Sequence, residues 1–481
     1  MLTILLNHEE AVPLYQQIYL GIRSEIEQGS LLPDEKLPSK RSLAVHLQVS
    51  TVTVQAAYDQ LVAEGYLITK PRSGYYVAED LNLLLPGQHT ELHFTPKQNA
   101  VSVSASEQPE LVRFSTGGVD TQQFPFSTWA KLSRQVLATC QDHLLDAMPP
   151  CGIWELRCAI AKHLYAYRHM QVQPEQLIIG AGSEYLIGLL VQLLGRERRY
   201  AVEDPGYRKT MRVFTANGAA VDPVSVDADG MQVEQLARTA ASVAHVTPSH
   251  HFPTGIVMPL KRRLELLQWA QQCPGRYILE EEYDSELQFT SAPVSALQSL
   301  DYSGSVVYLN TFAKTLAPSF RISYMVLPPQ LLQQYQQQLA FYACTVPSLE
   351  QYTLVRFLQE GYFERHLNRM KKIYRKRRDS LLAVIQQHAL VDALRISGAA
   401  AGPHFLLEVH TGQSEERLIA LARQVGVEVH GLSEFYQAPS LQQHPPTLVI
   451  GYACLEEETM RQGAKAMLDQ WAAHLTETKF Q

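Results

Sequence analysis

The chain has 481 residues, of which 46% are apolar and 19% charged, and a formal net charge of −7. This length predicts two or three domains, and the composition is typical of an ordinary soluble globular protein. The negative net charge excludes a protein that attracts nucleic acid through an overall basic field, so any nucleic-acid site must be local.

The cysteines and the apolar runs indicate the cellular compartment of the protein. Six cysteines lie far apart, with no Cys-x-x-Cys pair and no zinc spacing, which is typical of a reducing cytoplasm without structural disulfides. The opening MLTILLNHEE lacks the basic segment of a signal peptide. No segment approaches the roughly 20 apolar residues of a membrane-spanning helix. We therefore expect a cytoplasmic protein with no membrane partner and no metal site.

Residues 13–77 predict three helices followed by a hairpin. The first helix begins at Pro13, carries isoleucine at every fourth position and ends at Gly29. Ser39 and Ser50 are the expected N-caps of the second and third helices. The run YLITKPRSGYYV then predicts two strands around a turn. Three helices and a two-stranded wing indicate a winged helix-turn-helix.

The third helix would present its first turn to the major groove of DNA. Small polar residues suit that position, and the chain has Ser50, Thr51 and Thr53 there. Basic residues that suit phosphates or the minor groove precede this helix and occupy the wing: Lys40, Arg41, Lys70 and Arg72. The alternative is a small interaction domain with ordinary solvated charges, because Met1–Asp80 holds six basic residues against ten acidic ones.

The segment from PLYQQIY to SGYYV resembles the winged-helix domain of the GntR family of bacterial regulators along its whole length. The resemblance rests on the run EKLPSKRSLAVHLQVSTVTVQAAYDQLVAEGYL and on the glycine of the wing. It implies a DNA-binding domain over residues 1–78, with contacts to double-stranded DNA from Arg41, Ser50, Thr51, Thr53 and the wing through Gly74. Thr51 stands where the family often has Arg or Lys.

A polar stretch without periodicity covers residues 79–111 and predicts an interdomain linker. From residue 112 onward, strand-like runs such as QLIIGAG, RYAVEDPG and RYILEEEYD alternate with amphipathic helices. This alternation predicts an α/β domain with a mainly parallel sheet covered on both faces. Residues 363–475 predict a smaller C-terminal α/β subdomain.

The run YLNTFAKTLAPSFR contains the first candidate for a cofactor site. Lys314 follows a strand-like run, with Thr311 before it and Arg321 after it. A lysine that bonds an aldehyde needs a strand end, partial desolvation and anion donors nearby. A single loop lysine is more often simply solvated, so this run leaves both interpretations open.

Three more strand ends carry residues that suit the same cofactor. IIGAGSEYL predicts a glycine-rich turn before a helix, where Gly182 and Ser183 could cradle a phosphate. AVEDPGY ends with Tyr207, an aromatic side chain able to stack on a planar ring. YILEEEYDSEL supplies Glu281 and Tyr283, a carboxylate and a phenol. Because ligands of open α/β sheets bind at the carboxyl ends of strands, we expect these residues to form one site.

This set, with VTPSHHFPTG between the second and third elements, resembles fold-type-I aminotransferases. It is most similar to the aminotransferase-like domain of the MocR subfamily of GntR regulators, over residues 112–475, and especially to the GABA-responsive members. The resemblance implies that pyridoxal 5'-phosphate is bound covalently by Lys314. It further implies roles for the other residues: the phosphate with Gly182, Ser183, Thr311 and Arg321, the ring with Tyr207, the ring hydroxyl with Tyr283 and the pyridine nitrogen with Glu281.

Four positions depart from the enzymatic pattern. Glu281 stands where the family normally has Asp, and Ala313 replaces a serine beside the lysine. Ala147 occupies the position of a tyrosine that reaches a phosphate across a dimer. Cys454 replaces the arginine that clamps a substrate carboxylate in the enzymes. These changes favour a sensor over a catalyst.

We therefore expect a homodimeric transcriptional regulator whose effector is a small amine, an amino acid or the vitamer itself. Two alternatives stay open at this point. One is an active aminotransferase with an appended DNA-binding domain, and the other is a scaffold that senses its effector without pyridoxal phosphate.

Overall fold

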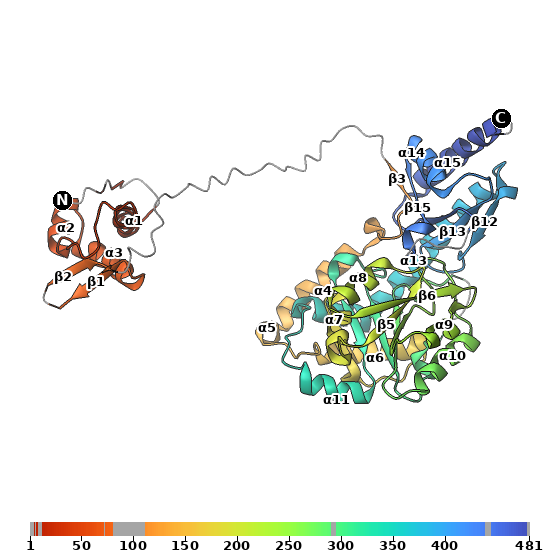
Figure 1. Ribbon diagram of the computed structural model, residues 1–481, viewed down its shortest axis with the longest axis horizontal. Coiled ribbons are helices and arrows are strands. Elements are labelled where there is room, and N and C mark those ends of the chain that lie inside the picture. The colour runs from red at the N-terminus through yellow and green to blue at the C-terminus, as the bar shows by residue number, and fades with distance from the viewer. Residues whose placement is uncertain are drawn as a thin grey trace. The chain divides into compact units, whose positions relative to one another are not determined.

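The computed structural model describes residues 4, 6–7, 12–71, 73–79, 111–289, 295–437 and 444–478. The chain divides into two compact units, Met1–Ser106 and Glu107–Gln481 (Figure 1). The predicted linker over 79–111 falls almost wholly outside the described residues, and so does Arg72. Among the helices that the described ranges contain, none is long and apolar enough to cross a membrane.

The first unit is a winged helix, as predicted. Its elements are α1 Leu14–Glu27, α2 Lys40–Leu47, α3 Thr51–Ala63, β1 Leu67–Lys70 and β2 Gly74–Val77. The strands pair antiparallel, and Gly74 takes a φ of 118° that favours glycine at the wing turn. Ile18, Ile22 and Tyr58 lie in a core that the three helices share with both strands.

The second unit is built on an eight-stranded sheet with the order β4-β11-β10-β9-β8-β5-β6-β7. The strands are β4 Leu177–Gly180, β5 Arg199–Asp204, β6 Ala220–Asp227, β7 Gly230–Met231, β8 Val243–Val246, β9 Tyr277–Glu282, β10 Val306–Thr311 and β11 Ser323–Val326. The five strands from β10 to β6 are mutually parallel. Strand β11 is antiparallel to both neighbours, so β4 points the same way as the parallel set. The carboxyl ends of β4, β5, β8, β9 and β10 therefore share one edge.

Helices cover both faces of this sheet (Figure 1). They are α4 Phe126–Thr139, α5 Gln141–Leu145, α6 Trp154–Arg168, α7 Ser183–Leu194, α8 Arg208–Ala216, α9 Val233–Arg238, α10 Leu260–Gln271, α11 Pro329–Gln338 and α12 Ser348–Gln359. Successive residues of a strand point to opposite faces. Accordingly, Val307 packs with α7 and α11, whereas its neighbour Val306 packs with α10. This two-sided burial explains why the strands read as continuous apolar runs.

The long helix α13 Tyr362–Gln386 precedes a smaller α/β subdomain. The antiparallel sheet of this subdomain has the order β12-β13-β16-β15. Its strands are β12 Leu394–Ser397, β13 His404–Val409, β16 Thr447–Gly451 and β15 His430–Gly431. Its helices are α14 Glu415–Gln424 and α15 Glu457–Thr478. Strand β3 Val112–Arg113, the first of this unit, pairs in parallel with β14 Val427–Glu428, so the chain enters the unit against the small subdomain.

Short 3-10 turns complete the unit. They are η2 Thr121–Gln123, η3 Pro174–Gln176, η4 Gln298–Leu300, η5 Pro318–Phe320, η6 Val391–Ala393 and η7 Leu432–Phe435. The observed architecture confirms the predicted fold class, a winged helix with a mainly parallel α/β domain and a smaller C-terminal subdomain.

Candidate functional site

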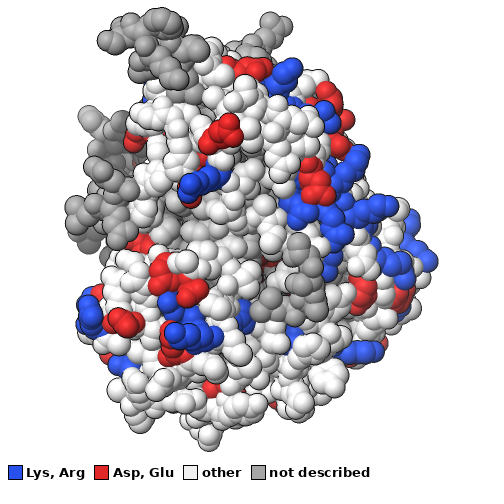
Figure 2. Space-filling model, turned by 90° about the vertical axis from the view of Figure 1, so that its right-hand side faces the viewer, with Lys and Arg blue, Asp and Glu red and all other residues white. Residues whose placement is uncertain are grey.

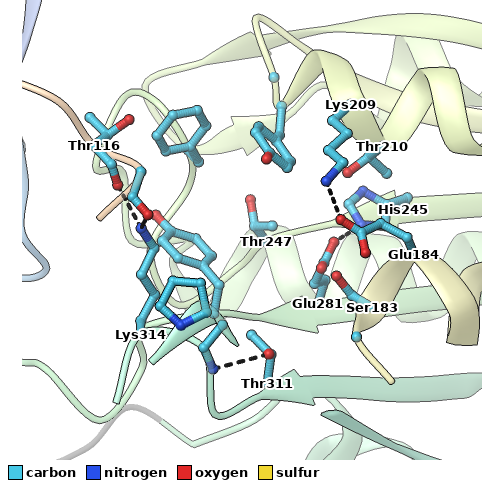
Figure 3. A pocket seen from close by; sticks show the side chains of 18 of the residues that line it. Thr116, Ser183, Glu184, Lys209, Thr210, His245, Thr247, Glu281, Thr311 and Lys314 are labelled. Atoms are coloured by element: carbon cyan, nitrogen blue, oxygen red, sulfur yellow. Dashed lines mark hydrogen bonds and ion pairs between the residues drawn. The ribbon is translucent and has the colours of Figure 1, made fainter. Parts of the chain in front are cut away.

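A cavity of about 280 Å³ lies at the carboxyl edge of the large sheet, where residues of the small subdomain also line it. Every residue predicted to contact a cofactor lines this cavity: Lys314, Gly182, Ser183, Tyr207, Glu281, Tyr283, Thr311 and Arg321. Lys314 and Thr116 lie at one end, and Ser183, Glu184 and Lys209 lie at the other (Figure 3).

Lys314 occupies the end of the cavity next to the loop that follows β3. Its Nζ donates to the carbonyl oxygens of Thr116 at 2.6 Å and Gly117 at 3.0 Å. Burial lowers the pKa of Lys314, although the carboxylate of Asp284 opposes that shift. Burial also lowers the pKa of the neighbouring His404 well below its ordinary value, so the imidazole stays neutral. Burial thus shifts the balance at Lys314 toward its neutral, nucleophilic amine form.

The opposite end is suited to an anion. Helix α7 begins at Ser183, and the N–H groups of a first helical turn have no partner within the helix. Arg321 and Lys209 both form ion pairs with Glu184. Burial opposes ionisation of Glu184, but the hydrogen bonds from the two cations outweigh it and lower the pKa of this carboxyl. One carboxylate between two cations leaves a net positive charge at the helix N-terminus.

Gly182 makes this close arrangement possible. Its φ is 97°, a conformation that favours glycine, and a Cβ there would collide with the guanidinium of Arg321. Thr311, at the end of β10, accepts hydrogen bonds from the Ser323 hydroxyl at 2.8 Å and from the Ala313 N–H at 3.2 Å. These bonds fix the turn that leads to Lys314.

Glu281 faces the cavity from β9 and is held by His245 of the adjacent strand β8. The Oε2 atom of Glu281 lies 2.7 Å from Nε2 of His245 (Figure 3). A carboxylate held in this way keeps one oxygen available for another donor. Such a donor would be a protonated ring nitrogen in the cavity.

Two tyrosines flank the space between these ends. Tyr207 is 54% exposed, and its ring stands edge-on to Phe252 with centroids 5.7 Å apart. Tyr283 is packed differently, with its hydroxyl 3.1 Å from Nδ1 of His250, which lies 2.8 Å from Oδ2 of Asp284. Burial raises the pKa of Tyr283 well above its ordinary value, so the phenol stays protonated.

The residues therefore fit pyridoxal phosphate. The helix end with Arg321 and Lys209 suits the phosphate, Glu281 suits the ring nitrogen, and Lys314 suits the aldehyde. The absence of a Cβ at Gly182 leaves the room that this cradle needs.

Several lining residues were not predicted from the sequence, namely Thr116, Gly117, Glu184, Lys209 and His245. A signal existed for two of them. Lys209 follows Tyr207 by two residues in EDPGYRK, and His245 interrupts the apolar strand VAHV. Thr116 and Gly117 reach Lys314 from nearly 200 residues away, which no local pattern reveals.

The departures from the enzymatic pattern differ in position. Ala313 lines the cavity, whereas Ala147 and Cys454 are not among the residues that form its wall. The Sγ atom of Cys454 packs so closely on Gly118 that a Cβ there would collide with it. The carbonyl of Ala453 accepts a hydrogen bond of 2.5 Å from Arg377, which is also paired with Asp120 at 2.6 Å.

The second candidate site is the exposed surface of the winged helix. Ser50 is the N-cap of α3, and its Oγ accepts from the Thr53 N–H at 3.1 Å. Thr51, the first residue of α3, is exposed, and so is Arg41 in the first turn of α2. Val52, which the sequence did not single out, is 75% exposed beside Thr51 and could contact a thymine methyl group.

The predicted phosphate-binding lysines of this unit already have partners. Lys40 donates to Gln55 and lies over the ring of Tyr75. Lys70 forms ion pairs with Asp34 and Glu79. Of the described residues of the wing, Lys70 is therefore less free to bind a phosphate than the sequence indicates.

Comparisons with known proteins identify a family for each of the two units. Residues 14–77 match the family model for bacterial regulatory proteins of the gntR family, and residues 109–467 match aminotransferase class I and II. The HTH-type transcriptional regulator YdeL of Bacillus subtilis is 36% identical over 98% of this chain and 99% of its own. The probable rhizopine catabolism regulatory protein MocR of Rhizobium meliloti is 34% identical over 98% and 96%.

Solved structures agree on the fold of the large unit. A multiple substrate aminotransferase from Thermococcus profundus superimposes with a TM-score of 0.67 at 22% identity, covering 77% of this chain and 93% of its own. The structure thus defines a class of protein, a winged helix joined to an aminotransferase-like domain. The chain belongs to the GntR family of bacterial regulatory proteins, in the MocR-type branch that carries this second domain.

Proposed function

We propose that this protein is a transcriptional regulator that binds operator DNA and uses pyridoxal phosphate to sense a small amine, an amino acid or the vitamer itself. The winged helix within residues 1–78 binds the DNA, and the domain over 112–475 holds the cofactor. The observation that carries the proposal is the cavity, in which a desolvated lysine faces an anion-binding helix end.

The residues of the cavity have distinct roles in this proposal. Arg321 and the first turn of α7 bind the phosphate, and Glu281 accepts a hydrogen bond from the protonated ring nitrogen. Tyr207 packs on the ring, and Tyr283 donates to the ring oxygen. When bound, pyridoxal phosphate supplies an aldehyde that reacts with amines and a ring that withdraws electrons. Lys314 supplies the amine that the effector displaces.

In this proposal the protein has two arrangements of its units that differ in affinity for DNA. Effector binding changes DNA binding only if these two arrangements also bind the effector with different affinities. A homodimer formed through the large unit would present two winged helices to one operator with two half-sites. Both the dimer and the effector are parts of this proposal.

Absorption spectroscopy tests the cofactor. The purified protein supplied with pyridoxal phosphate should show the visible absorption of the lysine-bound cofactor, and Lys314→Ala should abolish it. Lys261→Ala, which changes an exposed lysine of α10, is the matched control and should keep the absorption. A colourless wild-type protein would contradict the cofactor and support the scaffold that works without it.

Two further measurements separate the regulator from an active aminotransferase. Turnover of amino donors and keto-acid acceptors should be absent, because Ala313 and Cys454 depart from the enzymatic pattern. The DNA upstream of the protein's own gene should be bound specifically, and Arg41→Ala should weaken that binding. Steady turnover would favour the enzyme, and unchanged affinity of Arg41→Ala would contradict the proposed DNA contact.

A further inference from the structure

Helix α13 carries the strongest concentration of positive charge in the described part of the large unit. Its 25 residues, YFERHLNRMKKIYRKRRDSLLAVIQ, include eight Lys or Arg and only two Asp or Glu. The whole chain, in contrast, has a net charge of −7. Figure 2 shows Lys and Arg side chains gathered at one side of the face that it presents.

Four of the eight basic residues of α13 fall on one face of the helix. Positions three or four apart share a face, and the exposed residues with that spacing are Arg365, Arg369, Lys372 and Lys376. The buried residues on the opposite side include Phe363, Met370 and Tyr374. At 1.5 Å per residue, the basic face is about 16 Å long.

Little in the described residues neutralises this face. Lys372 has no hydrogen bond or ion pair there, and Arg369 donates to the carbonyl of Gln123, which carries no net charge. Lys376 pairs with Glu457 at 2.6 Å but stays 72% exposed. An ordinary solvated helix face alternates charges of both signs. Between Glu364 and Asp379, however, α13 has no acidic residue.

The winged helix has the opposite character. Met1–Asp80 holds more acidic than basic residues, and Lys70 of the wing is already paired with two carboxylates. Because neutralised phosphates supply most of the sequence-independent affinity for DNA, this unit alone has few contacts to offer. In the described part of the chain, the basic face of α13 therefore offers a polyanion the most complementary charge.

We propose that the basic face of α13 binds the phosphates of duplex DNA beside the site bound by the winged helix. B-DNA carries one charge per about 1.7 Å of axis, so a face about 16 Å long runs past on the order of ten phosphates. Residues 80–110 between the units can span at most about 100 Å, which permits both units to reach one duplex. This contact positions the large unit on DNA and reads no bases.

Salt-dependent binding of random-sequence duplex DNA to the full-length protein tests the contact. The double variant Lys372→Gln, Lys376→Gln should lower the slope of log K against log salt by about 2 for each protein copy engaged, since each neutralised phosphate contributes about 0.9. The matched control is Arg238→Gln, Lys261→Gln, which changes two exposed residues of α9 and α10 without a hydrogen bond or ion pair in the described ranges. Its slope should equal that of the wild type.

Lysine acetylation measured by mass spectrometry gives an independent readout. The duplex should protect Lys372 and Lys376 in the wild-type protein and leave Lys261 reactive. Equal slopes for the double variant and the wild type would overturn the proposal. Protection of Lys372 and Lys376 already in DNA-free protein would overturn it too, since the face would then be covered by another part of the protein or by a second copy.

Discussion

Lys314 is largely removed from water, and only its neutral amine can attack an aldehyde, so its protonation state sets how readily the cavity captures one. Burial disfavours the ammonium form and lowers the pKa of Lys314 below the ordinary value of 10.5. We predict that the rate of pyridoxal phosphate capture by the cofactor-free protein rises with pH, with its midpoint below that value. Rapid-mixing absorption measurements check this. A midpoint at or above the ordinary lysine pKa would show that the amine is not desolvated.

The same shift has a consequence for stability. The folded protein bears the cost of the buried ammonium at every pH below the folded pKa and loses it as pH rises toward the unfolded value. Cofactor-free Lys314→Met should therefore be more stable than the wild type at neutral pH. The difference should shrink as pH approaches 10.5. Denaturant unfolding at several pH values measures it, and a pH-independent difference would assign the effect to packing instead.

Alanine variants of the two glycines at the ends of α7 distinguish an effect on cofactor binding from an effect on stability. Gly182 and Gly195 have φ values of 97° and 118°, so alanine strains the backbone at both positions by about 1–3 kcal/mol. Only Gly182 adjoins Arg321, whereas a Cβ on Gly195 meets the flexible side chain of Glu197. We predict that both variants lose stability, but that only Gly182→Ala binds pyridoxal phosphate more weakly, by about tenfold or more. Equal affinities in a spectroscopic titration would exclude the α7 terminus as the phosphate site.

At the scale of elements, the start of α3 has a structural and a binding role that can be separated. Ser50 caps the helix through the Thr53 N–H, so Ser50→Ala should destabilise the winged helix by about 1 kcal/mol. Ser50→Asp keeps a capping oxygen and adds a negative charge that DNA phosphates repel. We predict near-normal stability but strongly weakened DNA binding for Ser50→Asp, measured by calorimetry and gel shift. Normal DNA binding by this variant would move the DNA contact away from the α3 start.

The elements that could be predicted are those whose signals are local. Ser39 and Ser50 act as the N-caps that the sequence predicted, and Gly65 ends α3 with a φ of 82°. The ends of β5, β9 and β10 were recognisable because each apolar run stops at a polar turn. Parallel pairing then brings such ends to one edge whatever the strand order.

The rest depended on contacts distant in sequence. The reversal of β11 between β10 and β4 follows from sheet pairing, which the run SYMV does not encode. The pairing of β3 with β14 joins residues more than 300 positions apart. His245 contacts Glu281 because β8 and β9 are neighbours in the sheet. A residue whose role depends on a neighbouring strand cannot be assigned before the strand order is known.

At the scale of the whole molecule, the two units have separate hydrophobic cores. The winged-helix core contains residues from Ile18 to Val77 together with partly buried residues of the same unit. Among the described residues, the cores of the second unit contain only residues from Val112 onward. A ligand that binds one unit stabilises that unit by RT ln(1 + [L]/Kd), which is about 2.7 kcal/mol at a hundredfold excess over Kd.

We therefore predict two thermal transitions, of which pyridoxal phosphate raises only that of the large unit, by several degrees. Differential scanning calorimetry of the full-length protein measures both transitions in one experiment. Lys314→Ala should reduce the rise, since it removes the covalent part of the binding and leaves the phosphate contacts of Arg321 in place. A single transition that shifts as one would show that the units unfold together, and cofactor binding would then be transmitted directly to the stability of the winged helix.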